Sequence, residues 1–294
     1  MRCLILGGDG MLGHRLFKSW RPRHEVRVTL RGDLAHYASY GLFSAENAYD
    51  HVDVRHTDRL LEVLSEFRPE AVVNAVGIVK QREAAKAPLP CLEVNALFPH
   101  RLNFLCRTFS ARLVHVSTDC VFNGRRGAYR EQDPADAEDL YGLSKYLGEV
   151  AEPPGVTLRT SIIGVELKAK RSLVEWFLAQ RGTIRGFTRA IYTGLTAAEM
   201  ARVMEMVLTE HPHLAGVWHV ASEPISKHEL LSKLCRRLGR RDVVIEPDAS
   251  VACDRSLRGD AFAQATGYAA PSWDHMLDEL SQEIQQRNAY HAAA

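Results

Sequence analysis

Long apolar runs are missing from this sequence of 294 residues. No stretch approaches the roughly 18 apolar residues that a membrane-spanning helix needs, and the apolar segment at the N-terminus is too short for a secretory signal. Only six cysteines occur, and none forms a CxxC pair, so a zinc site is not expected. Neither sign of charge is in excess, with 37 Lys+Arg against 36 Asp+Glu, which argues against nucleic-acid binding. We therefore expect a cytoplasmic protein with no membrane or nucleic-acid partner.

The first half of the chain alternates short β-branched segments with helical patterns. Strands are predicted over 2–6, 24–30, 52–54, 70–76, 112–117 and 156–160, and helices over 11–20, 58–67, 92–109 and 140–150, the third bent at Pro99. Strands that alternate with helices form βαβ units and a parallel sheet. The nearly continuous apolar strand 70–76 indicates that both faces of this sheet are covered. The predicted fold class is α/β, a Rossmann-like doubly wound parallel sheet with a smaller C-terminal α/β substrate domain.

The pattern becomes less regular after about residue 162. Helices are predicted over 172–180, 196–210 and 274–285 and after Ser226, and strands over 217–221 and 243–245. Thr196 with Glu199, and Ser226 with Glu229, form capping boxes that start helices, and Gly239 is a typical helix stop. We predict a Rossmann domain over 1–162, to which later segments return, and a mainly substrate-binding domain over 163–294.

A glycine-rich loop follows the first predicted strand and opens the first predicted helix. Gly7, Gly10 and Gly13 give a GxxGxxG pattern, which allows a tight turn, a close approach to a pyrophosphate and close packing of helix on strand. The N-terminus of the helix then offers unpaired N–H groups to the anion. We predict a dinucleotide site that includes Gly7, Gly10, Met11, Leu12 and Gly13.

The residues after the second predicted strand bear on the choice between NAD and NADP. NAD sites place an acidic residue there for the ribose 2′-hydroxyl, whereas this sequence has Arg31 first and Asp33 two residues later. An arginine suits the 2′-phosphate of NADP. NADP(H) is therefore favoured, and Asp33 leaves NAD(H) open. Asp53 and Val54, at the end of the third predicted strand, are expected to border the adenine.

Tyr141 and Lys145 form a YxxxK pattern on a predicted helix, where residues i and i+4 share one face. A nearby ammonium lowers the pKa of a phenol from its usual value near 10, and Tyr141 then becomes a general acid for a carbonyl oxygen whose carbon receives hydride. Thr118 ends the fifth predicted strand, at the sheet edge where ligands bind in such folds. Its hydroxyl can hold the same carbonyl oxygen. The three residues together predict a carbonyl-reducing site.

With these motifs the chain resembles the extended short-chain dehydrogenase/reductase family, and within it the branch of dTDP-4-dehydrorhamnose reductases. The resemblance covers essentially the whole chain. It is carried by GGDGMLG at 7–13, NAVG at 74–77, VNALFP at 94–99, STDCVFNG at 117–124, YGLSK at 141–145, RTSIIG at 159–164, HVASEPISKHELL at 219–231, DRSL at 254–257 and PSW at 271–273. The resemblance implies an oxidoreductase of polysaccharide biosynthesis that reduces a keto group on a nucleotide-diphosphate sugar.

The resemblance also implies roles for single residues. Thr118, Tyr141 and Lys145 form the catalytic set, and Lys145 also holds the nicotinamide ribose. Cofactor residues in the middle of the chain are Asn74, Ala75 and Val76, with Asn95 supporting the site. Expected substrate residues are Val79, Lys80, Asp119, Arg189 and Arg255, with Arg82 and Arg185 as further candidates for the diphosphate. The magnesium site of some relatives cannot be placed residue by residue, so no metal is expected.

The sequence departs from the pattern of this branch at three places. Cys120 stands where the branch usually has tyrosine, Gly77-Ile78-Val79-Lys80 replaces a small-plus-aromatic run, and the segment 172–193, which includes Tyr192, differs throughout. Lys168, Lys170 and Arg171 form a basic loop that either closes over a ligand or is simply exposed. An epimerase or dehydratase of the same family and a non-catalytic NADP-binding regulatory subunit stay open as alternatives, and a homodimer is expected by analogy.

Overall fold

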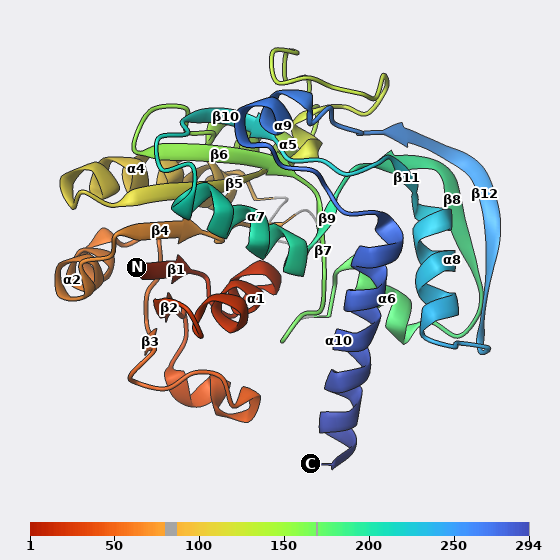
Figure 1. Cartoon of the computed structure of the whole chain (residues 1–294), viewed down its shortest axis with the longest axis horizontal. Coiled ribbons are helices and arrows are strands. Elements are labelled where there is room, and N and C mark those ends of the chain that lie inside the picture. Colours follow the sequence, from red (N-terminus) through yellow and green to blue (C-terminus); the bar gives the residue numbers. More distant parts are fainter. Residues whose placement is uncertain (80–86, 169, 294) are drawn as a thin grey trace.

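A computed structural model describes residues 1–79, 87–168 and 170–293 of the chain. Its centre is a sheet of seven parallel strands in the order β10-β6-β5-β4-β1-β2-β3 (Figure 1). This order, with β1 beside both β2 and β4, is the Rossmann order extended by one strand, so the predicted fold class is confirmed. The strands are β1 (Arg2–Leu6), β2 (Glu25–Thr29), β3 (Ala48–Tyr49), β4 (Ala71–Asn74), β5 (Arg112–Thr118), β6 (Gly155–Thr160) and β10 (Gly216–His219).

Helices cover both faces of this sheet, as the apolar strands predicted. In β1, Cys3 and Ile5 lie in the core formed with α1 (Met11–Trp20) and α7 (Ala197–Thr209). The alternate residues Leu4 and Leu6 lie in the core formed with α2 (Thr57–Phe67) and α4 (Phe98–Thr108). Successive side chains of a strand point to opposite faces, so a strand buried on both sides reads as an unbroken apolar run.

The C-terminal half builds a second, smaller group of elements beside the sheet (Figure 1). A three-stranded sheet has the order β11-β8-β12, and β7 pairs with β9. β10 pairs with β6 in the large sheet and α7 packs on it, whereas the division into domains at 162/163 stays a prediction. These elements are β7 (Ile162–Ile163), α6 (Leu173–Ala179), β8 (Gly182–Tyr192), β9 (Leu195–Thr196), β11 (Ile225–Ser226), α8 (Lys227–Arg237), β12 (Val243–Asp254), α9 (Asp260–Thr266) and α10 (Trp273–Ala293).

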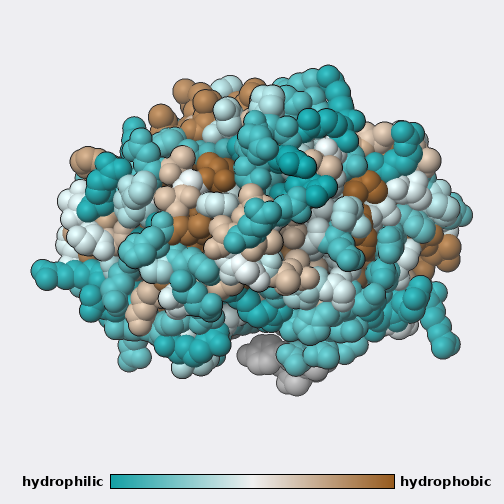
Figure 2. Space-filling model, turned by 45° about the horizontal axis from the view of Figure 1, so that its top comes forward, coloured by the Kyte–Doolittle hydropathy of each residue, from teal (hydrophilic) through white to brown (hydrophobic). Residues whose placement is uncertain are grey.

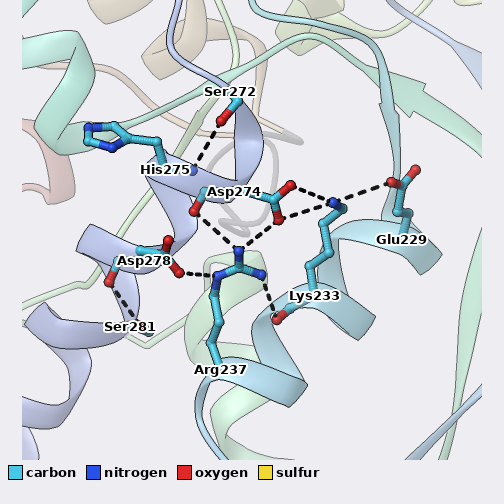
Figure 3. Close-up of polar contacts among 8 residues, drawn as sticks. All are labelled: Glu229, Lys233, Arg237, Ser272, Asp274, His275, Asp278 and Ser281. Carbon is cyan, nitrogen blue, oxygen red and sulfur yellow. Dashed lines mark hydrogen bonds and ion pairs between the residues drawn. The ribbon is translucent and has the colours of Figure 1, made fainter.

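A network of charged side chains joins α8 to α10 (Figure 3). The Arg237 guanidinium contacts Asp274 at 2.7 Å and Asp278 at 2.6 Å, and the Lys233 ammonium contacts Asp274 at 3.0 Å. Helix α8 begins where the sequence predicts, with the side chain of its N-cap Ser226 accepting the Glu229 N–H. The two aspartates are more than half exposed, so we expect each of these ion pairs to contribute only about 0–1 kcal/mol.

Several predicted elements differ from the observed ones. The third strand is β3, and the predicted strand 52–54 is wrong because those residues form a loop. The predicted helix 92–109 begins earlier, at α3 (Pro88–Cys91), and continues through a π-helical segment η3 (Leu92–Leu97) into α4. Its irregularity thus lies before Pro99, which stands in the first turn of α4, where proline is tolerated. β8 was missed, and β12 is much longer than the predicted strand 243–245.

The surface is mostly hydrophilic on the face drawn in Figure 2, where hydrophobic residues form separate patches. Among the described residues, no helix is both long and apolar enough to span a lipid bilayer. Short helices complete the fold where loops leave the sheet: η1 (Leu34–Tyr40) after β2, η4 (Asp119–Val121) after β5, and α5 (Leu140–Leu147). The last two position the candidate site.

Candidate active site

The glycine loop leaves β1 and turns directly into α1. Gly7 has φ of +80°, and the Gly10 N–H donates to the Gly7 carbonyl at 3.0 Å. A Cβ on Gly13 would collide with that same carbonyl, so only glycine lets the helix pack this closely on the loop. No side chain caps the helix at Gly10, which leaves the N–H groups of the first turn, beginning with Met11 and Leu12, available to an anion at the positive end of the helix dipole.

Arg31 and Asp33, beyond the end of β2, have different surroundings. Arg31 is exposed, and its guanidinium has no hydrogen bond or ion pair with any described residue. The Asp33 carboxylate accepts the Ala35 N–H at 2.7 Å and thereby caps η1. It also lies 3.7 Å from Nε2 of His51. The carboxylate is thus engaged within its own loop while the guanidinium is available, an arrangement that suits a phosphate better than a hydroxyl.

Asp53 and Val54 lie in the loop after β3. Val54 is buried in the core with α2. The Asp53 carboxylate pairs with Arg55 at 2.6 Å, and hydrogen bonds from Arg55 are the main cause that lowers the pKa of Asp53 to about 2. The carboxylate is therefore ionised and already paired, and its predicted contact with adenine stays a prediction.

The end of β4 faces the glycine loop. A Cβ on Gly7 would lie 3.0 Å from Cγ2 of Val76 and 3.4 Å from the Ala75 carbonyl oxygen. Asn74 is buried, and its amide oxygen accepts the Val76 N–H at 3.2 Å while its amide nitrogen lies 3.1 Å from Nδ1 of His115. The structure thus brings three predicted cofactor residues against the predicted phosphate loop, with Asn74 fixing the backbone turn.

Asn95 connects this turn to the helix that carries Tyr141. Its buried side chain holds both backbone groups of Ile78, accepting the N–H at 2.9 Å and donating to the carbonyl at 3.0 Å. It also donates to the hydroxyl of Ser144 in α5 at 3.1 Å. One side chain thus ties the β4 loop to α5, and the role of Asn95 in supporting the cofactor site stays a prediction.

Helix α5 packs closely on the end of β5 and so places Tyr141 beside Thr118. The Asp139 carboxylate caps α5 by accepting the Gly142 N–H at 2.9 Å. A Cβ on Gly142 would collide with the Cys120 carbonyl. This close approach brings Tyr141 near Thr118, whose side chain acts to lower the pKa of the phenol.

The predicted lowering of the Tyr141 pKa by Lys145 is wrong for this structure. Burial is the largest influence and raises the pKa of Tyr141, and Cys120 and Asp119 raise it further. The Lys145 ammonium instead donates to the Val116 carbonyl at 2.7 Å. Burial lowers the pKa of Lys145 to about 8. At neutral pH the phenol therefore carries its proton, which is the form that a proton donor needs.

Asp119 follows Thr118 in the chain, and Arg255 lies near enough to influence its carboxylate. The buried Asp119 carboxylate accepts a hydrogen bond from the Thr118 hydroxyl at 3.1 Å. Burial raises the pKa of Asp119, and Arg255 opposes this shift. The Arg255 side chain packs on Gly124 and donates from Nε to the Phe122 carbonyl at 2.9 Å. The chain thus returns from β12 to place a cation beside the loop after β5.

A buried ion pair, which the sequence did not indicate, lies beside the end of β5. The Glu149 carboxylate makes two contacts of 2.7 Å with the Arg159 guanidinium, and both side chains are only 5% exposed. The carboxylate also accepts the Ser117 hydroxyl at 2.6 Å. The network therefore connects the residue beside Thr118 to β6 and to the end of α5.

Tyr192 lies at the end of β8. From the sequence it is notable only as part of the segment 172–193, which departs from the pattern of the reductase branch. Its hydroxyl is buried and finds no partner among the described residues. Burial, with Asp119 as the second cause, raises the pKa of Tyr192 well above its ordinary value. Its ring packs against Trp273, with the ring centres 5.7 Å apart. Gly182 and Gly186 weaken the strand pattern of β8, and no local signal in the sequence points to this phenol.

The remaining predicted substrate residues are less closely associated with the site. Arg189 is exposed on β8, and its guanidinium makes no hydrogen bond or ion pair within the described part of the chain. Arg185 is exposed and lies 3.7 Å from Asp248. Val79 is 42% exposed after β4, and Lys80 and Arg82 lie outside the described residues.

The family model described as RmlD substrate binding domain matches residues 1–285. The chain belongs to this family. Among curated relatives, the probable low-salt glycan biosynthesis reductase Agl14 of Haloferax volcanii is 27% identical over 271 residues, which are 87% of this chain and 86% of that protein. A dTDP-4-dehydrorhamnose reductase of Aggregatibacter actinomycetemcomitans is 26% identical over 233 residues, 76% of this chain and 74% of its own.

A solved structure of dTDP-4-dehydrorhamnose reductase from Bacillus anthracis, in complex with NADP, has the same fold as this RmlD family member. Its TM-score is 0.77 at 22% identity, and the match covers 96% of this chain and 99% of that one. The resemblance stated from the sequence is therefore confirmed at the level of the family and of the fold.

Proposed function

We propose that this protein is an NAD(P)H-dependent reductase of a keto group on a nucleotide-diphosphate sugar. The observation that carries the proposal is the close packing of α5 on the end of β5, which brings Tyr141 near Thr118 at the carboxyl edge of a Rossmann sheet. Membership of the RmlD family and relatives that are named reductases support the same conclusion.

The glycine loop and its neighbours fit a dinucleotide. A side chain on Gly13 would fill the space between loop and helix, the first turn of α1 lacks a side-chain cap, and Arg31 is exposed without a partner in the described ranges. We assign the pyrophosphate to the first turn of α1 and the 2′-phosphate to Arg31, so NADP(H) is favoured and NAD(H) is accepted less well. The relative solved with NADP supports this preference. Bound nicotinamide would supply the hydride.

The residues of the chain then handle the proton and the developing charge. Tyr141 donates its phenolic proton to the carbonyl oxygen, and Thr118 holds that oxygen by a hydrogen bond while negative charge develops on it. Lys145 keeps an ammonium close to the site and positions the nicotinamide ribose. Burial raises the pKa of Tyr141, so the phenol carries at neutral pH the proton that a general acid donates.

On the substrate side, we assign the sugar to the space beside Asp119, Arg255 and Tyr192. Asp119 and the unpartnered phenol of Tyr192 offer groups for sugar hydroxyls, and Arg255 offers a cation for the diphosphate. Cys120, which adjoins both Thr118 and Asp119, is smaller than the tyrosine of the branch, so the pocket differs from that of the rhamnose enzymes. Arg189 and Val79 are assigned to its rim.

The decisive experiment follows NADPH oxidation with a panel of 4-keto nucleotide sugars. Tyr141→Phe is expected to reduce turnover by a factor of about 100 or more while leaving NADPH affinity unchanged. Tyr146→Phe is the matched control, because Tyr146 lies on the same helix but is exposed, and it should keep full activity. Retained turnover in Tyr141→Phe would refute the proposed mechanism. Absence of turnover in the unmodified protein, with tight cofactor binding, would favour the epimerase or the regulatory subunit.

We further propose a cytoplasmic homodimer. Helices η3–α4 and α5 contact each other and expose large apolar side chains, which are Leu97, Phe104, Leu143 and Leu147. Exposed apolar clusters of this kind commonly mark subunit interfaces, and a second copy is the occupant proposed here. Phe104→Glu should convert a dimer to a monomer in light scattering after size-exclusion chromatography. A monomeric unmodified protein would refute the proposal.

A further inference from the structure

Lys168, in the segment between β7 and α6, reaches back to the glycine loop. Its ammonium forms an ion pair with the carboxylate of Asp9. The same ammonium lies 5.2 Å from the centre of the Tyr37 ring, which is buried in η1. The Lys168 side chain is 40% exposed, so it lies at the surface between two loops that are far apart in the sequence.

Both partners of Lys168 adjoin the end of β2, where Arg31 lies. The Gly8 N–H donates to the Thr29 carbonyl at 3.0 Å, which places the next residue, Asp9, beside the end of that strand. On the other side, the Tyr37 hydroxyl accepts the Gly32 N–H at 3.3 Å. Lys168 and the backbone next to Arg31 therefore lie near the same end of β2, at the edge of the glycine loop.

Glu166, which precedes Lys168, makes contacts with residues that follow Lys168 in the sequence. The Glu166 carboxylate accepts the N–H groups of Arg171 at 3.1 Å and Ser172 at 2.8 Å, closing the segment at its base. The Glu166 N–H donates to the buried carboxylate of Glu175 in α6 at 2.9 Å. These contacts hold Glu166, Arg171 and Ser172, which precede and follow Lys168 in the chain.

We infer that Lys168 is a second cation, beside Arg31, for the 2′-phosphate of NADP(H), and that Asp9 holds it there. The inference rests on the proposed function, because it assigns the cofactor to the glycine loop. A phosphate monoester carries roughly −1.5 to −2 charges at neutral pH, so one guanidinium neutralises only part of it. The Asp9 carboxylate would repel the phosphate unless Lys168 neutralises it. NADH, which has a hydroxyl at this position, needs neither cation.

The test measures dissociation constants of the full chain for NADPH, NADH, 2′,5′-ADP and 5′-AMP by isothermal titration calorimetry. Lys168→Ala is expected to raise the dissociation constants of NADPH and 2′,5′-ADP by about tenfold, because one charge-assisted contact is lost. The dissociation constants of NADH and 5′-AMP should stay unchanged. Lys170→Ala is the matched control, because Lys170 is an exposed lysine of the same segment, and it should bind all four as before.

A second variant separates direct contact from neutralisation of Asp9. If Lys168 contacts the phosphate, the double variant Asp9→Asn/Lys168→Ala should still prefer NADPH over NADH less strongly than the unmodified protein does. Full recovery of that preference in the double variant would overturn the inference, as would an equal weakening of NADPH and NADH. Unchanged NADPH affinity in Lys168→Ala refutes this inference alone. By contrast, failure of the unmodified protein to bind any of the four nucleotides refutes the proposed function itself.

Discussion

The Lys145 ammonium donates a hydrogen bond of 2.7 Å to the carbonyl oxygen of Val116, in the strand that ends at Thr118. Burial lowers the pKa of this ammonium from 10.5 to about 8. Between these two values the unfolded chain binds more protons than the folded chain, so the free energy of unfolding rises with pH in this window. Below pH 8 the cost of burying the charge is present in full.

The first prediction therefore compares the unmodified protein with Lys145→Met by urea denaturation at several pH values. The free energy of unfolding of the unmodified protein should increase relative to that of the variant as the pH rises from about 8 to 10.5. Taking the difference between the two proteins cancels the other titrating groups. A difference that stays constant across this window would mean that the ammonium is not desolvated, and would contradict the burial seen here.

Gly142 gives a prediction on how α5 is positioned. A Cβ at this residue would collide with the Cys120 carbonyl, so Gly142→Ala must push α5 away from β5 and Tyr141 away from Thr118. We expect a loss of about 1–3 kcal/mol in the free energy of unfolding and a larger proportional loss in kcat than in cofactor affinity. Gly259→Ala is the control, since a Cβ there would meet only ordinary contacts at 3.5 Å. Normal kcat in Gly142→Ala would show that the close packing is not needed.

The glycine loop and its flanking elements could be predicted well, because the residues that determine them are close together in the sequence. β1 and α1 were predicted with the bounds that the structure has, since the apolar strand, the glycines and the amphipathic helix follow one another directly. The strand β8 was missed because Gly182 and Gly186 weaken its pattern. The orientation of Lys145 could not be predicted either. The spacing of Lys145 from Tyr141 indicated that both residues lie on one face of a helix. The ammonium of Lys145, however, donates to the Val116 carbonyl of the neighbouring strand β5.

The phenol of Tyr192 yields a prediction in which stability and activity move in opposite directions. An unpartnered buried hydroxyl costs about 1–3 kcal/mol, and phenylalanine keeps the packing against Trp273. Tyr192→Phe should therefore be at least as stable as the unmodified protein in thermal denaturation. If the hydroxyl binds the sugar, kcat/KM should fall about tenfold. A less stable variant would point to a hidden partner, and an unchanged kcat/KM would remove Tyr192 from the pocket.

The Glu149–Arg159 pair leads to the largest predicted change in stability. Both side chains are 5% exposed, so Glu149→Gln leaves a buried guanidinium without its counter-charge, and we expect the free energy of unfolding to fall by about 3–5 kcal/mol. Asp278→Asn is the contrasting control, because it removes a contact of similar length from the exposed network between α8 and α10 (Figure 3). That change should cost no more than about 1 kcal/mol. Urea denaturation at pH 7 measures the free energy of unfolding of both variants. Similar losses in the two would show that water reaches Glu149, which would contradict its burial beside β5.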